Sequence, residues 1–152
     1  MIDRAAEQDL PNILALQRAA FREEAEFVGD MNIKPMAQTL DDLRQEFGKA
    51  VILKYEENGT IIGSVRAYPE NGTCYINRLI VHPDHWSKGI GTALMDAVEL
   101  EFKDADRFEL FTRTDHRRTR PFYQRLGYLP FKEEKVSQTL TFVYLEKKNQ
   151  KK

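Results

Sequence analysis

A β-strand pattern that leads directly into an amphipathic helix constrains the fold of this chain more than any other feature. Residues 75–81 (YINRLIV) are rich in apolar and β-branched side chains, as in a strand with a buried face. Beyond a short turn, Ile90, Leu94, Val98 and Phe102 recur every four residues, which is typical of a helix with one apolar face. A strand that feeds a helix in this way predicts a domain in which helices cover a sheet.

The turn that joins this strand to this helix has the composition of an anion site. The first N–H groups of a helix lack backbone acceptors and carry a partial positive charge. Gly89 and Gly91 have no Cβ, so an anion can approach these amides closely, while Lys88 adds a cation. Thr92 either contributes a hydroxyl or caps the helix. On these residues alone, a phosphate site and a plain glycine-containing connection are equally good interpretations.

Two well-known classes of phosphate-binding turn do not fit these residues. A P-loop has two glycines five residues apart, followed by lysine and then serine or threonine, and that spacing is absent from the turn. A dinucleotide fingerprint requires a third glycine, and Leu94 stands at that position. An anion bound at this turn therefore belongs to another class of ligand.

The periodicities along the rest of the chain predict an α/β (α+β) fold. Asn58-Gly59 and Asn71-Gly72 are typical of tight hairpin turns and separate three strands in the middle of the chain. We expect a mixed, mostly antiparallel sheet of about six to seven strands flanked by about four helices, in one domain over residues 1–146. Residues 147–152 are expected to form a disordered basic tail. The expected elements are a strand at Ile2, helices over 9–26, 39–48, 91–103 and 119–126, and strands over 50–55, 60–68, 74–81, 107–112, 128–131 and 139–145.

The charge balance and the single cysteine argue against several classes of function. With 23 basic and 24 acidic residues the net charge is −1, which gives no reason to expect nucleic acid or an anionic membrane as a partner. No apolar run reaches the ~20 residues that span a bilayer. Cys74 has no second cysteine to pair with, so a reducing, cytoplasmic location is expected. His82 and His85 have no further ligands at metal-binding spacing, so no metal is expected.

Two motifs resemble those of a known family. The stretch 81–95 (VHPDHWSKGIGTALM) is similar to the acetyl-CoA loop of the GNAT family of N-acetyltransferases, whose signature is Q/R-x-x-G-x-G/A. Further on, 122–128 (FYQRLGY) is similar to the second motif of that family, F-Y-x-x-x-G-F/Y. The order of elements also matches the family over nearly the whole chain. The resemblance implies an N-acetyltransferase that uses acetyl-CoA and acts by direct attack of an amine in a ternary complex.

The resemblance also implies a set of cofactor-binding residues. In the family, backbone amides of the loop hold the pyrophosphate, and the end of the preceding strand pairs with the pantetheine arm and polarises the thioester carbonyl. Trp86 stands at the usual Gln/Arg position and Ser87 at a frequent glycine, which should weaken binding only modestly. His116 stands where the family often has asparagine, and it either faces the cofactor or lies in a solvated loop. The implied cofactor-binding residues are Leu79, Ile80, Val81, Trp86, Ser87, Lys88, Gly89, Ile90, Gly91, Thr92 and His116.

For the chemistry, the resemblance assigns one residue and leaves another role open. Tyr123 matches the family tyrosine that protonates the leaving sulfur, and a phenol is suited to that step. The alternative is that Tyr123 is only part of the inward face of a helix. Some family members use a glutamate on the strand before the loop as general base, but Tyr75 and Asn77 lack a carboxylate. The general base is therefore unassigned.

The acceptor side carries two opposing signals. Glu23 and Glu24 would attract a cationic amine, unless they are only a solvated helix end. Arg66 and Arg78 would instead recognise a carboxylate on the acceptor. These signals leave the acceptor open. The resemblance implies a primary amine of a small molecule or a peptide, and a homodimer is compatible with it. The competing hypothesis is a non-catalytic acyl-CoA-binding or regulatory module with the same fold.

Overall fold

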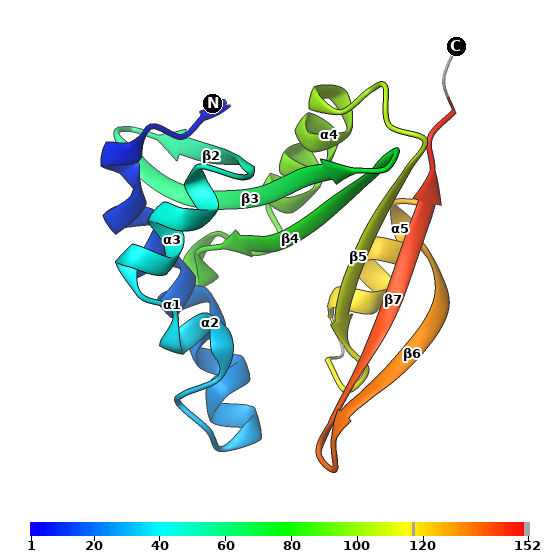
Figure 1. Ribbon diagram of the computed structural model, residues 1–152. Coiled ribbons are helices and arrows are strands. Elements are labelled where there is room, and N and C mark those ends of the chain that lie inside the picture. Colours follow the sequence, from blue (N-terminus) through cyan, green and yellow to red (C-terminus); the bar gives the residue numbers. More distant parts are fainter. Residues whose placement is uncertain (117, 151–152) are drawn as a thin grey trace. The chain divides into compact units, whose positions relative to one another are not determined.

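The computed structural model describes residues 1–116 and 118–150, and these residues form two compact units. Unit 1 comprises Met1–Tyr68 and Arg78–Val98, and unit 2 comprises Pro69–Asn77 and Glu99–Lys152. The chain therefore passes from one unit to the other at Pro69, at Arg78 and at Glu99. The elements can be followed along the chain by colour in Figure 1.

Seven strands and five α-helices occur in the described part of the chain, which confirms the predicted mixed, mostly antiparallel α/β fold. The strand order in the sheet is β1-β2-β3-β4-β5-β7-β6. The strands are β1 (Ile2–Arg4), β2 (Val51–Glu57), β3 (Thr60–Glu70), β4 (Thr73–Val81), β5 (Arg107–Arg113), β6 (Leu129–Ser137) and β7 (Leu140–Lys148). The helices are α1 (Leu10–Val28), α2 (Lys34–Ala37), α3 (Leu40–Phe47), α4 (Ile90–Glu101) and α5 (Thr119–Arg125).

In unit 1, a three-stranded antiparallel segment carries the first helices. β1 pairs with β2, and β2 pairs with β3 in a register that aligns Val51 with Ala67. Helices α1 and α3 form the core of this region with β2, through Leu10, Ile13, Leu14, Leu43 and Ile52. Leu10, Ile13 and Leu14 recur with the helical period in α1 and are buried, so this apolar face is the one that the helix packs against its neighbours.

Helix α4 lies very close to β3 at one position, Gly63. A Cβ added there would lie 3.0 Å from Ile90 Cγ2 and 3.0 Å from Leu94 Cδ1. Both contacts are tighter than normal van der Waals packing, so the missing side chain is what lets the first turn of α4 rest on the strand. Gly63 thereby fixes the depth of the helix whose N-terminus follows the predicted phosphate turn.

We predict that Gly63→Ala lowers the free energy of unfolding by about 1–3 kcal/mol, because the added methyl overpacks the interface with α4. Without the close contact with α4, replacing a strand glycine by alanine would slightly raise the free energy of unfolding. The sign of the change therefore tests whether α4 packs closely on Gly63. Gly48→Ala is the matched control, since the nearest atom to its added methyl is Gln45 O at 3.7 Å. Denaturant unfolding of both variants measures the difference, and an unchanged midpoint for Gly63→Ala would contradict the packing argument.

In unit 2, the first part of β4 pairs in parallel with β5, from Thr73↔Arg107 to Tyr75↔Glu109. β5 then pairs antiparallel with β7, and β7 with β6. A partly buried polar cluster ties this unit together: the Tyr128 hydroxyl donates to Glu99 Oε2 at 3.0 Å, and Lys147 Nζ donates to Glu99 Oε1 at 2.9 Å. The charge of Glu99 is thereby paired inside the unit.

The C-terminal end of the chain is more ordered than the sequence predicts. β7 continues through Lys148, and the Asn149 side chain donates to the carbonyls of Lys103 and Ala105, both at 2.8 Å. The expected disordered tail over 147–152 is therefore wrong from Lys147 to Asn149, because backbone pairing and this amide hold those residues. Lys151 and Lys152 lie outside the described residues.

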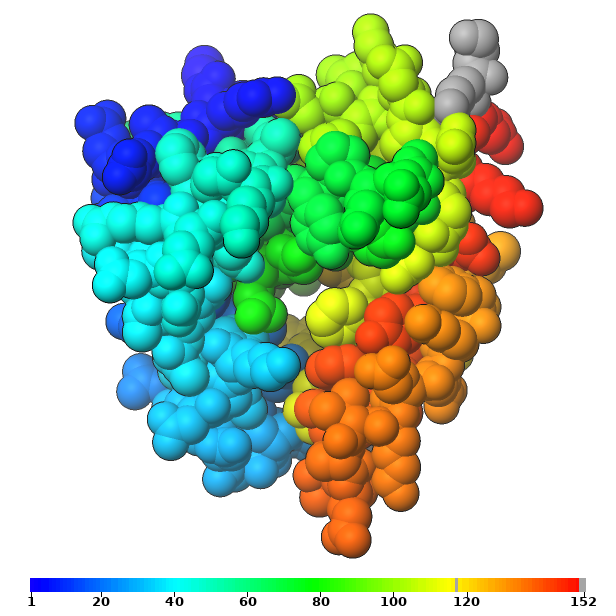
Figure 2. Space-filling view, viewed as in Figure 1, coloured from blue at the N-terminus to red at the C-terminus, as the bar shows by residue number. Residues whose placement is uncertain are grey.

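Strand β6 is exposed over its whole length. All nine of its residues are exposed, and the orange segment of Figure 2 shows it at the surface. The sequence indicated only a short strand entry at 128–131, because the alternating charges after Phe131 hide the strand pattern. None of the helices in the described ranges combines the length and apolar character needed to cross a membrane.

Candidate functional site

The predicted phosphate turn lies in unit 1 and has the backbone of an open anion site. Ser87 and Gly89 both adopt positive φ, 65° and 83°, so the chain turns sharply before α4 begins at Ile90. A Cβ on Gly89 would meet no atom within 4 Å, which shows that the space in front of this residue is open. The Ala93 N–H donates to Gly89 O at 3.0 Å, so the amides of the first turn point forward without helical acceptors.

Two residues of the turn depart from the family signature, and the structure explains both. The Trp86 indole Nε1 donates to Val81 O at 2.8 Å, so Trp86 ties the turn to the end of β4. The Gln/Arg of the signature is thus replaced by a residue that supports the turn. Ser87 occupies the left-handed region that glycine reaches more easily, which accounts for the frequent glycine at this position in the family.

The end of β4 is held to β3 within unit 1. Ile80 is 3% exposed, while Leu79 and Val81 are half-buried. Beyond them, the His82 N–H donates to Ile62 O at 2.8 Å, and His82 Nδ1 accepts from the Asp84 N–H at 3.1 Å. The strand end and the turn that follows are therefore fixed before any ligand binds.

Tyr123 and His116 both lie in unit 2. Tyr123 is buried on α5, 9% exposed, with its ring against Phe122 and Tyr128 at centroid distances of 5.1 and 6.1 Å. Burial raises the pKa of its phenol, so the proton is retained at neutral pH. His116 is half-buried after β5, and its N–H donates to Arg113 O at 3.3 Å.

Arg66 does not lie where the sequence led us to expect it. Its side chain is 1% exposed, and Nη1 donates to Glu46 Oε2 at 2.7 Å and to Gln38 Oε1 at 3.1 Å, while Nη2 donates to Gln17. The expected contact between Arg66 and the substrate is therefore wrong: Arg66 lies in the core and holds the side chain of Gln38. Strand β3 is buried at every residue from 62 to 67, so Arg66 is enclosed whichever face it lies on, and polar partners from α1 and α3 make that burial stable.

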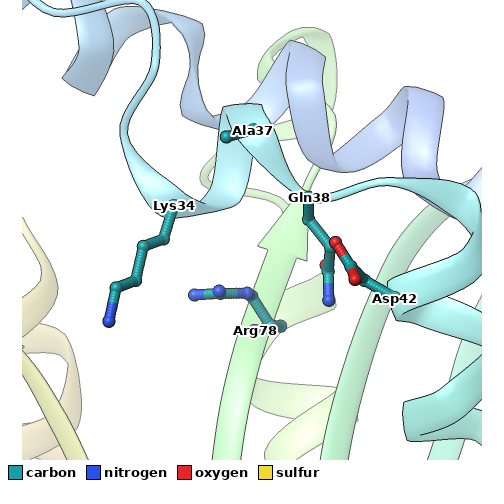
Figure 3. A pocket seen from close by; sticks show the side chains of 5 residues that line it. All are labelled: Lys34, Ala37, Gln38, Asp42 and Arg78. Atoms are coloured by element: carbon teal, nitrogen blue, oxygen red, sulfur yellow. The ribbon is translucent and has the colours of Figure 1, made fainter.

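Arg78 faces a pocket of about 290 Å³ in unit 1, lined by Lys34, Ala37, Gln38, Asp42 and Arg78. Figure 3 shows the Arg78 guanidinium extending from β4 below α2, toward Lys34. The residue has φ 51°, a left-handed conformation within β4 that costs about 1–3 kcal/mol for a residue other than glycine. Of the two arginines expected on the acceptor side, only Arg78 lines this pocket.

The two acidic candidates lie near the end of α1. Glu23 is exposed and Glu24 is half-buried, so only part of this pair is solvated. Burial lowers the pKa of Arg78, and the charges of Glu46 and then Glu24 partly offset this, so Glu24 lies within electrostatic reach of the arginine. Glu24 and Arg78, which the sequence predicted as residues of the acceptor side, are therefore near each other.

Lys34 and Gln38 were not predicted as site residues. Lys34 is the first residue of helix α2 and Gln38 directly follows its last, and this helix of four residues is too short to show a helical period. The available signal was Pro35, because proline is favoured in the first turn of a helix. A reading of Lys34-Pro35 as a helix start would have placed Lys34 and Gln38 on one short element.

Neither the cysteine thiol nor a group of metal ligands adds a reactive centre in the described residues. Cys74 is buried, and burial, with the charge of Glu99, raises the pKa of its thiol to about 12. The thiol is therefore protonated at neutral pH and is a poor nucleophile. Among the residues described, no three or more His, Cys, Asp or Glu side chains are grouped as ligands for one ion.

Comparison with known proteins assigns the family. The model of the Acetyltransferase (GNAT) family matches residues 11–128, a range that contains both the turn and Tyr123. The UPF0157 protein YqkA of Bacillus subtilis (strain 168) is 30% identical over 128 residues, which are 84% of this chain and 37% of that protein. This chain thus spans little more than a third of that curated relative.

Solved structures share the fold at low sequence identity. The ribosomal-protein-S18-alanine N-acetyltransferase from Escherichia coli has a TM-score of 0.81 at 14% identity, covering 98% of this chain and 93% of that one. The PaiA N-acetyltransferase from Thermoplasma acidophilum, in complex with coenzyme A, has a TM-score of 0.78 at 18% identity, covering 97% and 98%. The match of the family model and this shared fold agree with the two motifs, and the chain belongs to the acetyltransferase (GNAT) family.

Proposed function

We propose that this protein transfers the acetyl group of acetyl-CoA to the primary amine of a small molecule or peptide. The observation that carries the proposal is the open turn before α4, where Gly89 has φ 83° and free space in front of it. Such a turn presents helix N-terminal amides to an anion such as a pyrophosphate. The PaiA structure in complex with coenzyme A, which has the same fold, supports coenzyme A as the owner of that pyrophosphate.

The proposed reaction proceeds by direct attack of the amine on the thioester. The amine must be neutral, the thioester carbonyl must be polarised, and the departing thiolate must take up a proton. The backbone of Leu79, Ile80 and Val81 is assigned to the pantetheine arm and the carbonyl. Tyr123 is assigned to the proton, because its raised pKa keeps the phenol protonated until a thiolate forms. The protonated thiol of Cys74 argues against a covalent acyl-cysteine route.

A non-catalytic acyl-CoA-binding module is the second candidate. It is favoured by the absence of a carboxylate at Tyr75 and Asn77 on β4, and by the structural use of Trp86 in place of a ligand-binding Gln or Arg. Direct attack needs no protein base when the amine has a low pKa or when water relays the proton. The missing carboxylate therefore does not by itself exclude catalysis.

Thiol release from acetyl-CoA across a panel of amines, amino acids, polyamines and peptides tests the proposal. Turnover with at least one amine class, together with calorimetric binding of acetyl-CoA, is the expected result. Tight acetyl-CoA binding without turnover on the whole panel would support the binding module instead. Absence of acetyl-CoA binding would overturn both candidates.

A further inference from the structure

The pocket below α2 has an unusual balance of charge. Its lining contains two cations, Lys34 and Arg78, and one acid, Asp42, with an amide at Gln38. At about 290 Å³ it is near the lower limit of the ~300–1,000 Å³ typical of small-molecule sites, so it suits one polar group and a short stem. Figure 3 shows the charged ends of Lys34 and Arg78 on one side of it, and Gln38 and Asp42 on the other.

Asp42 is already used by the local fold. Its Oδ2 accepts from the Thr39 N–H at 3.0 Å, while its own N–H donates to Thr39 Oγ1 at 3.1 Å. These hydrogen bonds from Thr39 lower the pKa of Asp42, so it is ionised and committed to the start of α3. Asp42 therefore stabilises the helix start, although its charge still counts in the pocket.

Gln38 is equally committed. Its Oε1 accepts from Gln17 Nε2 at 2.9 Å and from Arg66 Nη1 at 3.1 Å, and its Nε2 donates to Glu46 Oε2 at 3.0 Å. This network fixes the amide against the core, so the wall of the pocket that Gln38 forms is rigid. The Glu46 carboxylate is bound by Arg66 at 2.7 Å in the same network.

Arg78 forms no ion pair with the described acids of this network, since Glu46 is bound by Arg66. Its Nε is buried and has no hydrogen-bond partner among the residues described. Burial lowers the pKa of the guanidinium, and the charges of Glu46 and Glu24 offset this only in part. Buried polar groups are nearly always hydrogen-bonded, so an unused guanidinium nitrogen beside a pocket points to a missing acceptor.

We propose that this pocket binds the carboxylate of the acceptor, so that the substrate is an amine that also carries a carboxylate, such as an amino acid. The inference rests on the proposed acetyl transfer. Lys34 and Arg78 against Asp42 leave one net positive charge, which suits a singly charged carboxylate better than a doubly charged phosphate. Arg78 directly precedes Leu79–Val81, the strand segment assigned to the thioester, so a carboxylate held here tethers the amine within the same unit.

The kinetic test compares each amino acid with its amide. With the twenty L-amino acids and their amides as probes, the expected result is turnover of at least one acid with a KM at least about tenfold below that of its amide. Arg78→Gln should raise the KM for that acid by about 10–100-fold, while changing the KM for its amide and for acetyl-CoA little. Arg44→Gln removes an equal charge from an exposed site on α3, beside Asp41, and should leave the KM values for the acid and for its amide unchanged.

A second variant guards against a folding defect at position 78. Lys34 is exposed, so Lys34→Gln should fold normally and still raise the KM for the acid, whereas Arg78→Lys should recover part of the loss. O-phosphoethanolamine and β-alanine, a phosphate and a carboxylate on similar short amines, distinguish the two anions. Preference for the phosphate, or equal KM values for acids and amides in the wild type, would overturn the carboxylate assignment while leaving acetyl transfer intact.

A binding measurement keeps the inference testable without turnover. N-acetyl amino acids and their N-acetyl amides, the products of the two reactions, can be titrated by calorimetry. Binding of the acids that is lost in Arg78→Gln would support the pocket even if no amine is acetylated, in which case only the proposed function fails. Equal binding of acids and amides, or binding unchanged in Arg78→Gln, would overturn the pocket.

Discussion

Gly89→Asp is expected to abolish acetyl-CoA binding, with an affinity loss of at least about 100-fold. In the proposed complex, the amides that precede and begin α4 would face the pyrophosphate, and the space in front of Gly89 is open. An aspartate there would place a negative charge beside that pyrophosphate, and like charges in direct contact cost several kcal/mol. Calorimetric titration of acetyl-CoA into the variant and the wild type measures the loss.

Gly89→Asn is the control that separates charge from backbone strain. Asparagine has nearly the same size as aspartate and tolerates the left-handed conformation that φ 83° requires. It should therefore retain much more affinity than Gly89→Asp. If the aspartate variant binds acetyl-CoA as tightly as the wild type, the turn is not the pyrophosphate site. If both variants lose binding equally, the backbone conformation rather than the charge is decisive.

Tyr123→Phe is expected to lower kcat by about 10²–10⁴-fold with little change in the KM for acetyl-CoA, as for removal of a general acid. Because burial raises the phenol pKa above its ordinary value of about 10, wild-type Tyr123 stays protonated up to at least that pH. Any loss of activity on the alkaline side below about pH 10 must therefore come from another group. A pH–rate profile of the wild type, beside steady-state kinetics of the variant, checks both statements.

Tyr128→Phe provides the comparison for a purely structural tyrosine. The Tyr128 hydroxyl donates to Glu99, so its removal should reduce stability by about 1–3 kcal/mol and leave kcat nearly unchanged. The opposite pattern at Tyr123, with full turnover and reduced stability, would show that Tyr123 is only part of the core of unit 2. The pair thus distinguishes the two interpretations that the sequence left open.

The parts of the fold that the sequence predicted well are those with a clear period or a specific turn residue. Helix α1, the three central strands and the turn before α4 follow from apolar spacing and from Asn-Gly and glycine positions. Helix α2 was missed and the long strand β6 was predicted only over 128–131, because four residues show no period and a fully exposed strand has no apolar face. Both misses concern segments whose structure is set by their neighbours rather than by their own pattern.

The candidate site shows the same limit at the level of single residues. The turn before α4 could be predicted as a backbone feature, because glycine spacing indicates where the chain turns, whereas its assignment to a phosphate rests on the resemblance to the family. The different fates of Arg66 and Arg78 could not, because both are arginines on strands with apolar neighbours. What separates them is contacts with residues far away in the sequence: Gln17 of α1 and Glu46 of α3 enclose Arg66, while Arg78 lines the pocket below α2.

The interleaving of the two units has a consequence for how the chain acquires its structure. Unit 1 needs the segment Arg78–Val98 as well as Met1–Tyr68, and unit 2 needs Pro69–Asn77 together with everything after Val98. No continuous fragment contains one unit without part of the other, so neither can be obtained by simple truncation. During synthesis, unit 1 with its turn at Gly89 can form only after Val98 has left the ribosome. Many contacts of unit 1 then join residues that are far apart in the sequence, which slows folding.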